Sequence, residues 1–193
     1  MRTVFGITGG TGCGKTTALL ALEQLGVHII DCDAVYHRLL QTSTDMLRAI
    51  DLAFPGVVEN GVLQRKKLGA HVFSNPDALQ LLNNITGKFV LEAVTQELES
   101  HPGQPCAIDA IGLLESGLAE LCTVTVAVTA SEDVRAVRLM KREGISEEYA
   151  RLRIRAQKPN AYFSDACTLT LCNDFSSAEE FLQYSKDHLS KYL

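Results

Sequence analysis

The sequence has no segment suited to a membrane or to export. No apolar run reaches the roughly 18–20 residues that cross a bilayer. The longest run, residues 123–130, is the size of a strand and is interleaved with threonine. The N-terminus reaches Gly9-Gly10 too soon to contain the apolar core of a signal peptide. We therefore expect a cytoplasmic chain without a membrane partner.

The chain also has little positive charge and few cysteines. Its 18 Lys and Arg are outnumbered by 23 Asp and Glu, and a net charge of −5 argues against a nucleic acid as the main partner. The six cysteines form no C-x-x-C pair, so we expect packed thiols rather than disulfides or a zinc site. We find no repeats, low-complexity tracts or flexible linkers. The composition, 46% hydrophobic over 193 residues, predicts a globular domain with a substantial core.

Short apolar segments alternate with longer amphipathic segments along the chain. The predicted strands are residues 4–8, 27–31, 105–109, 123–129 and 168–172. Because helical stretches separate them, the connections are crossovers and the sheet is mainly parallel. The predicted fold class is α/β, with a P-loop NTPase-type parallel sheet flanked by helices.

A long region between the second and third predicted strands has a helical pattern. It contains segments at 45–54 and 65–73 and a long helix from Pro76 toward Ser100. We expect a kink in this helix at Gly87. Helices inserted into an α/β sheet often build a substrate pocket, and an extra packing layer would give the same pattern. Both interpretations remain open at this point.

The strongest motif is a glycine-rich loop after the first predicted strand. Residues 9–16 read Gly-Gly-Thr-Gly-Cys-Gly-Lys-Thr, a full match to G-x-x-x-x-G-K-[ST], and a predicted helix follows at 15–25. The glycines let consecutive N–H groups turn toward phosphate oxygens, Lys15 reaches the β and γ phosphates, and Thr16 supplies a hydroxyl to Mg²⁺. The motif predicts a site for ATP and Mg²⁺. The residues expected to bind the nucleotide are Gly9, Thr11, Gly12, Cys13, Gly14, Lys15, Thr16 and Thr17.

Carboxylates follow two of the predicted strands. Asp31 and Asp33 come after the second strand and share one side of an extended segment. Beside a phosphate site, one carboxylate holds the metal through water and the other accepts a hydroxyl proton; we assign these roles to Asp31 and Asp33 respectively. The structural alternative is that one aspartate caps a helix starting near residue 34. Asp109, at the end of the third strand, is equally consistent with a metal-linked and a structural role.

Positive charge is concentrated in one short segment. Residues 135–158 hold eight basic and three acidic side chains, a net charge of +5, so the rest of the chain carries −10. Arg135, Arg138 and Arg142 share one helix face, and Gly144 separates this helix from the next. Most charged helices are simply solvated, but an arginine-rich hairpin can also close over phosphates and stabilise the transition state. With a phosphate loop in the same chain, we favour a lid in which Arg142 is catalytic.

The order of these motifs resembles that of the dephospho-coenzyme A kinase family. The shared segments are the glycine-rich loop, the Asp-x-Asp pair, Arg65-Lys66-Lys67-Leu68 with 72–76, Leu113-Leu114-Glu115-Ser116-Gly117, and 138–146 with Ala156-Gln157. The resemblance implies transfer of the γ-phosphoryl group of ATP to the ribose 3′-hydroxyl of dephospho-coenzyme A, the last step of coenzyme A synthesis. It also implies that Asp33, Arg65 and Arg138 contact substrate.

The resemblance implies a single kinase domain, residues 1–193, built from three parts. These are a core at 1–33, 103–134 and 165–193, a helical substrate-binding insertion at 34–102, and a lid at 135–164. The partners would be two small-molecule substrates, ATP and dephospho-coenzyme A. We expect a monomer or a weak homo-oligomer.

Three other functions are compatible with the glycine-rich loop. A kinase of the same shape could act on a nucleoside monophosphate or a vitamin, and Gly87-Lys88, where the family usually has His-Pro, favours this alternative. A GTPase switch or motor ATPase is disfavoured, because there is no Asn-Lys-x-Asp guanine signature and the inserted helices suit a second substrate. A catalytically impaired homologue that only binds nucleotide is disfavoured by intact Lys15, Thr16 and Asp33.

Overall fold

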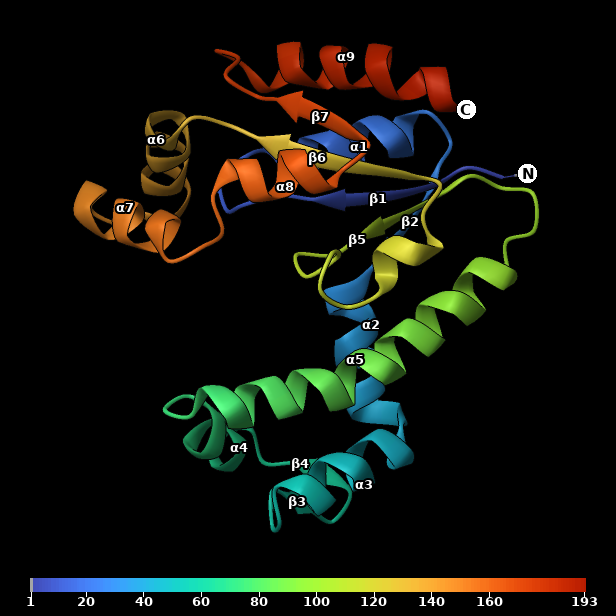
Figure 1. The fold of residues 1–193 in the computed structure, drawn as a ribbon, viewed down its shortest axis with the longest axis vertical. Helices are drawn as coiled ribbons and strands as arrows, with labels where there is room; N and C mark the ends of the chain where they lie inside the picture. Colours follow the sequence, from blue (N-terminus) through green and yellow to red (C-terminus); the bar gives the residue numbers. More distant parts are fainter. Residues whose placement is uncertain (1) are drawn as a thin grey trace. The chain divides into compact units, whose positions relative to one another are not determined.

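The computed structural model describes residues 2–193 (Figure 1). The chain forms two compact units, one made of residues 2–30 and 101–193 and the other of Asp31–Ser100. Among the helices of the described residues, none combines the length and the apolar character that crossing a membrane requires. The two units are described separately below.

A five-stranded sheet is the centre of the fold. Its strands are β1 (Val4–Thr8), β2 (His28–Asp31), β5 (Cys106–Asp109), β6 (Val124–Thr129) and β7 (Leu169–Cys172). They lie in the order β2-β5-β1-β6-β7, and β1 pairs in parallel with both β5 and β6. Every residue of β1 is buried, as expected for the central strand of a sheet covered on both faces. All five strands lie within one residue of their predicted ends, which confirms the predicted α/β class.

Helices cover this sheet and extend beyond its carboxyl edge. They are α1 (Lys15–Gln24), α6 (Glu132–Glu143), α7 (Glu147–Arg155), α8 (Asn160–Ala166) and α9 (Ala178–Leu189), with short 3₁₀ helices at Leu118–Leu121 and Ser190–Tyr192. Helices α1 and α9 pack together, and Leu22 and Phe181 join Val126 in the core against the sheet. Helices α6 and α7 pack against each other as a two-helix hairpin that lies past the carboxyl ends of the strands (Figure 1).

The second unit, Asp31–Ser100, is mostly helical and has its own core. Its elements are α2 (Cys32–Thr42), α3 (Thr44–Ala53), β3 (Val58–Glu59), β4 (Val62–Leu63), α4 (Arg65–Val72) and α5 (Pro76–Glu99). Met46, Ile50 and Val57 are fully buried in that core. Helix α5 begins where the sequence predicts, because Asn75 caps its first turn and Pro76 follows. The helix continues through Gly87 and bends near its middle (Figure 1).

Two features of the second unit were not predicted. Strands β3 and β4 form a small antiparallel hairpin whose turn places Asn60 and Gly61 at φ 50° and 76°. Two consecutive left-handed residues match the tight turn that Asn-Gly favours, so the dipeptide was the available signal. Helix α2 begins at Cys32 rather than near residue 34, because Asp31 caps it.

Candidate active site

The glycine-rich loop, residues 9–16, connects β1 to α1 and depends on three glycines with positive φ. Gly9, Gly12 and Gly14 have φ values of 150°, 76° and 98°, which L residues with side chains rarely adopt. A side chain at Gly9 would also collide with the carbonyl oxygen of Val128, and one at Gly14 with the amide of Asn173. The glycines therefore permit both the curl of the loop and its close packing. The loop ends at the N-terminus of α1, where the helix dipole favours an anion.

A cavity of about 610 Å³ lies over this loop. Loop residues form one side of it, and the other lining residues are Ile111, Arg138, Arg142, Arg153 and Gln157. Lys15 and three arginines give the cavity a strong positive charge. Its charge and its position at a helix N-terminus suit a polyphosphate ligand.

Lys15 forms an ion pair with Asp109 at the end of β5. Both side chains are only 20% exposed, so solvent screens the pair less than it would at the surface. The sequence left the role of Asp109 open, and the structure gives this carboxylate a defined partner. Asp109 holds the ammonium group at the cavity.

Arg135 supports the loop from outside the cavity. Its side chain is buried, with 3% exposure, and its Nε donates to the carbonyl oxygen of Thr11 at 2.8 Å. Its Nη2 donates to Oε1 of Gln157 at 3.0 Å, and the same oxygen accepts the N–H of Thr11 at 2.8 Å. Burial lowers the pKa of the Arg135 guanidinium. The sequence placed Arg135 on a lid face, whereas the structure gives it a role in holding the loop.

Arg138 and Asn173 hold the next two carbonyl groups of the loop. Arg138 Nη1 donates to the carbonyl oxygens of Gly12 and Cys13, and its Nη2 donates to Oδ1 of Asn173 at 3.0 Å. Asn173 Nδ2 donates to the carbonyl oxygen of Cys13 at 2.8 Å. In a trans peptide the carbonyl and the following N–H point in opposite directions. The N–H of Gly12, opposite the Thr11 carbonyl held by Arg135, and the N–H of Gly14, opposite the Cys13 carbonyl, are therefore directed away from the supporting side chains. The N–H of Cys13, opposite the Gly12 carbonyl, donates to the carbonyl oxygen of Gly10 at 3.3 Å.

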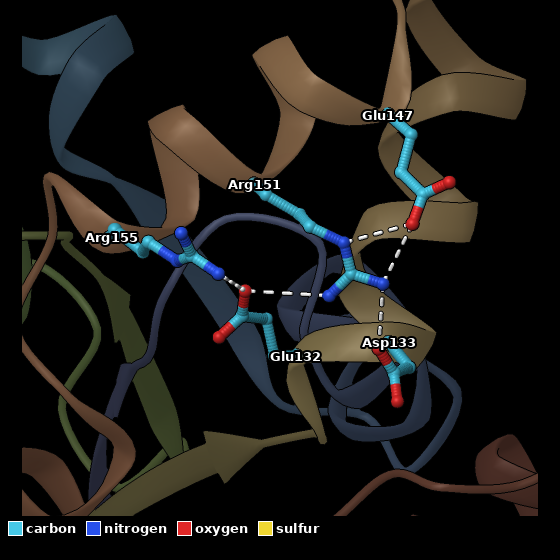
Figure 2. Close-up of polar contacts among 5 residues, drawn as sticks. All are labelled: Glu132, Asp133, Glu147, Arg151 and Arg155. Atoms are coloured by element: carbon cyan, nitrogen blue, oxygen red, sulfur yellow. Dashed lines mark hydrogen bonds and ion pairs between the residues drawn. The ribbon is translucent and has the colours of Figure 1, made fainter.

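The remaining hairpin arginines fall into two groups. Arg151 donates to Asp133, Glu147 and Glu132, and Arg155 pairs with Glu132 (Figure 2). The hydrogen bonds to Asp133 and Glu147 raise the pKa of the Arg151 guanidinium. Glu132 and Asp133 begin α6, just outside the segment 135–158, and including them lowers the segment's net charge from +5 to +3. Arg151 and Arg155 therefore link α7 to the start of α6 through ion pairs.

Arg142 and Arg153 form the second group, because both line the cavity. Each also contacts Glu143, and hydrogen bonds from Arg142 and then Arg153 lower the pKa of that carboxyl group. The sequence singled out Arg142 but not Arg153. The basic composition of residues 135–158 was the only available signal for Arg153, and it could not distinguish this arginine from Arg151.

Asp31, Asp33 and Arg65 lie in the second unit. Asp31 Oδ1 accepts the N–H groups of Asp33 and Ala34 at 2.9 and 3.0 Å, so the capping alternative is observed. Asp33 is exposed in the first turn of α2, and Arg65 is exposed at the start of α4. The catalytic role of Asp33, the metal role of Asp31 and the substrate contact of Arg65 stay predictions.

The residues at the cavity fit a magnesium ion bound mainly through phosphate and water. Thr16 lines the cavity and is exposed there. Over residues 2–193 no three His, Cys, Asp or Glu side chains gather into a metal cluster. Magnesium in nucleotide sites commonly takes one or two protein oxygens and fills the rest with phosphate and water. The Thr16 hydroxyl at the cavity would supply such an oxygen.

A second hollow of about 600 Å³ adjoins the loop and shares Gly14 and Arg138 with the first cavity. Its walls include the apolar side chains Val134, Val137 and Phe175. A flat, largely apolar group connected to a phosphate would fit there. Nothing in the spacing of these residues indicated this hollow in advance.

Cys13 should resist thiol reagents in the folded protein. Its side chain is buried beside Gly9, and burial raises the pKa of the thiol. Brief treatment with iodoacetamide at neutral pH, followed by peptide mass analysis, should leave Cys13 unmodified until a denaturant is added. The exposed Cys172 is the internal comparison. Early modification of Cys13 in the native protein would contradict its assignment as a packed residue.

Comparison with known proteins identifies a family. The family model described as dephospho-CoA kinase matches residues 3–179. A relative of that name from Dehalococcoides mccartyi is 38% identical over 159 residues, covering 80% of each chain. One from Geobacillus kaustophilus is 37% identical over 166 residues, covering 83% of each.

Solved structures share the fold over the whole chain. A protein from Thermus thermophilus has a TM-score of 0.80 at 29% identity, covering 100% of this chain and 98% of that one. A dephospho-CoA kinase from Campylobacter jejuni has a TM-score of 0.72 at 22% identity, covering 99% and 97%. At the latter identity the likeness shows the fold alone.

Proposed function

Because the chain belongs to the dephospho-CoA kinase family, we propose that it transfers the γ-phosphoryl group of ATP to the ribose 3′-hydroxyl of dephospho-CoA. The observation that carries the proposal is the glycine-rich loop beneath a cavity lined by Lys15, Arg138, Arg142 and Arg153. The substrates are small molecules. We also propose a cytoplasmic monomer or weak homo-oligomer that acts without nucleic acid or membrane.

The loop binds the phosphates through its backbone. Because Arg135 holds the Thr11 carbonyl and Arg138 and Asn173 hold the Cys13 carbonyl, the opposite N–H groups of Gly12 and Gly14 are set in advance to donate to phosphate oxygens. Lys15, held by Asp109, is placed to neutralise the β and γ phosphates. Little reorganisation is then needed when the triphosphate binds, which is the condition for strong electrostatic stabilisation.

Mg²⁺ bound with the nucleotide neutralises negative charge on the β and γ phosphate oxygens. We propose that Thr16 supplies its hydroxyl to the ion and that Asp31 contributes through water. The capping bonds of Asp31 use only its Oδ1. We place the adenine in the second hollow, against Val137 and Phe175.

The acceptor side belongs to the second unit in this proposal. Residues 34–102 bind dephospho-CoA, Arg65 contacts it, and Asp33 accepts the proton of the attacking 3′-hydroxyl. Residues 135–164 act as a lid that brings Arg142 to the transferred phosphoryl group. Arg138 contacts substrate from the cavity wall while it also holds the loop.

Arg142→Ala should lower turnover by roughly 10²-fold, because one cationic donor to the developing charge is lost. Nucleotide affinity should change by less than about threefold, since the loop and Lys15 supply most of the binding contacts. Steady-state kinetics and calorimetric nucleotide binding measure the two effects. Arg48→Ala is the control, because Arg48 is an exposed arginine that pairs only loosely with Asp45, at 3.7 Å, and its loss removes the same charge. Equal losses of turnover and affinity for Arg142→Ala would indicate an ordinary binding residue.

An acceptor panel tests the proposed function. Purified protein is incubated with Mg·ATP and separately with dephospho-CoA, nucleoside monophosphates or vitamins that carry a hydroxyl group, and the products are identified by mass. The proposal predicts that only dephospho-CoA gains a phosphate at a substantial rate. Transfer to another acceptor instead would support the alternative suggested by Gly87-Lys88 in α5.

A further inference from the structure

One oxygen atom connects the α6–α7 hairpin to the glycine-rich loop. Gln157 Oε1 accepts the N–H of Thr11 at 2.8 Å and a guanidinium N–H of Arg135 at 3.0 Å. Arg135 in turn donates to the carbonyl oxygen of Thr11 at 2.8 Å. The backbone donor and acceptor of Thr11 are thus both engaged by two side chains that are bonded to each other. Such a closed ring holds the orientation of both peptide groups that flank Thr11.

The packing around Gly10 shows how closely these two side chains approach the loop. A Cβ atom at Gly10 would lie 2.9 Å from Cζ of Arg135 and 3.2 Å from Oε1 of Gln157. Gly10 is not among the glycines with positive φ, so backbone conformation does not require glycine there. The motif G-x-x-x-x-G-K-[ST] leaves this position open as well. A side chain at position 10 would therefore displace the ends of Arg135 and Gln157 from the loop.

Gln157 lies just after the end of α7, the helix that carries Arg153. Its backbone N–H donates to the carbonyl of Ile154 at 3.1 Å. Both Arg153 and Gln157 line the cavity over the loop. Arg135 belongs to α6, so the ring engages both helices of the hairpin. A displacement of the end of α7 would move Gln157 away from Thr11 and Arg153 away from the cavity together.

We propose that Gln157 is a positioning residue for nucleotide binding: it holds the Thr11 peptide groups in the orientation that phosphate binding requires and sets the end of α7 beside the loop. This inference rests on the proposed function only in that the loop binds a nucleotide. If Gln157 is removed, the Thr11 N–H and the inner N–H of Arg135 lose their acceptor, and the loop gains alternative peptide orientations.

The test compares Gln157→Leu, which has no acceptor, with Gln157→Glu, which keeps one. Gln183→Leu in α9 is the matched control, since Gln183 is exposed and bonds only Asp187 among the described residues. Affinity for Mg·ADP is measured by calorimetry, exchange of the Thr11 amide by NMR, and the melting temperature by scanning calorimetry. Mg·ADP binding requires no acceptor substrate.

Gln157→Leu should bind Mg·ADP about tenfold more weakly, equivalent to about 1.4 kcal/mol, and its Thr11 amide should exchange faster. Gln157→Glu should keep the Thr11 amide protected, and this exchange is the readout for that variant, because its carboxylate lines the cavity and would itself repel the phosphates. Gln183→Leu should match the wild type in both measurements. A Gln157→Leu protein that melts earlier but binds Mg·ADP like the wild type would overturn the proposal in favour of a purely structural role. A wild type that binds Mg·ADP but leaves dephospho-CoA unmodified would contradict the proposed function alone.

Discussion

Asp33→Asn should reduce phosphoryl transfer by about 10²–10⁴-fold, the contribution typical of a positioned general base. Asparagine keeps the shape of the side chain, but it carries no charge and does not take up the proton of the acceptor hydroxyl. Affinity for Mg·ATP should stay close to that of the wild type, because the glycine-rich loop and Lys15 are unchanged. Single-turnover kinetics and calorimetric binding separate the two quantities.

The matched control for this variant is Asp45→Asn. Asp45 is also an exposed aspartate in the first turn of a helix of the second unit, and it pairs only loosely with Arg48, at 3.7 Å. Its replacement should leave transfer unchanged. Wild-type turnover in Asp33→Asn would remove the proposed base, whereas an equal loss in Asp45→Asn would point to a general effect of charge on the second unit.

Lys15→Met should lower transfer by about 10²–10³-fold and also weaken nucleotide binding, because a preorganised cation at the phosphates is lost. Methionine keeps the reach of the side chain without its charge. The substitution also leaves the Asp109 carboxylate without its partner, which by itself would repel a triphosphate.

The double variant Lys15→Met/Asp109→Asn separates these two causes. If the ammonium group acts on the phosphates, the double variant should remain as impaired in transfer as Lys15→Met. Recovery of most of the activity in the double variant would instead show that the unpaired Asp109 carboxylate causes the loss. Steady-state kinetics at saturating Mg·ATP make the comparison.

The sheet and the loop were predictable because their signals are local. Each strand is an apolar run bounded by turn or helix residues, and the glycine-rich loop is an eight-residue motif in which Gly9, Gly14, Lys15 and Thr16 are constrained. Helix α5 was predicted from Asn75 and Pro76 for the same reason. The β3–β4 hairpin was overlooked despite a local signal, the Asn60-Gly61 pair.

The roles of the arginines were not predictable, because tertiary contacts decide them. Arg135 and Arg142 share a face of α6 in the sequence pattern, yet Arg135 is buried against Thr11 whereas Arg142 lines the cavity. Arg151 and Arg153 are two residues apart, and only Arg153 lines the cavity. The carboxylates that engage Arg151 come partly from the start of another helix, so no pattern within α7 distinguishes these two arginines.

The central claim is transfer to the 3′-hydroxyl of dephospho-CoA, and a matched pair of acceptors tests it most directly. Purified protein with Mg·ATP is given dephospho-CoA or its 3′-deoxyribose analogue, and the products are identified by mass and by phosphorus NMR. Dephospho-CoA should gain one phosphate as a 3′-monoester, and the analogue should remain unchanged. Phosphorylation of the analogue, or no product from dephospho-CoA under conditions in which Mg·ATP binds, would contradict the claim.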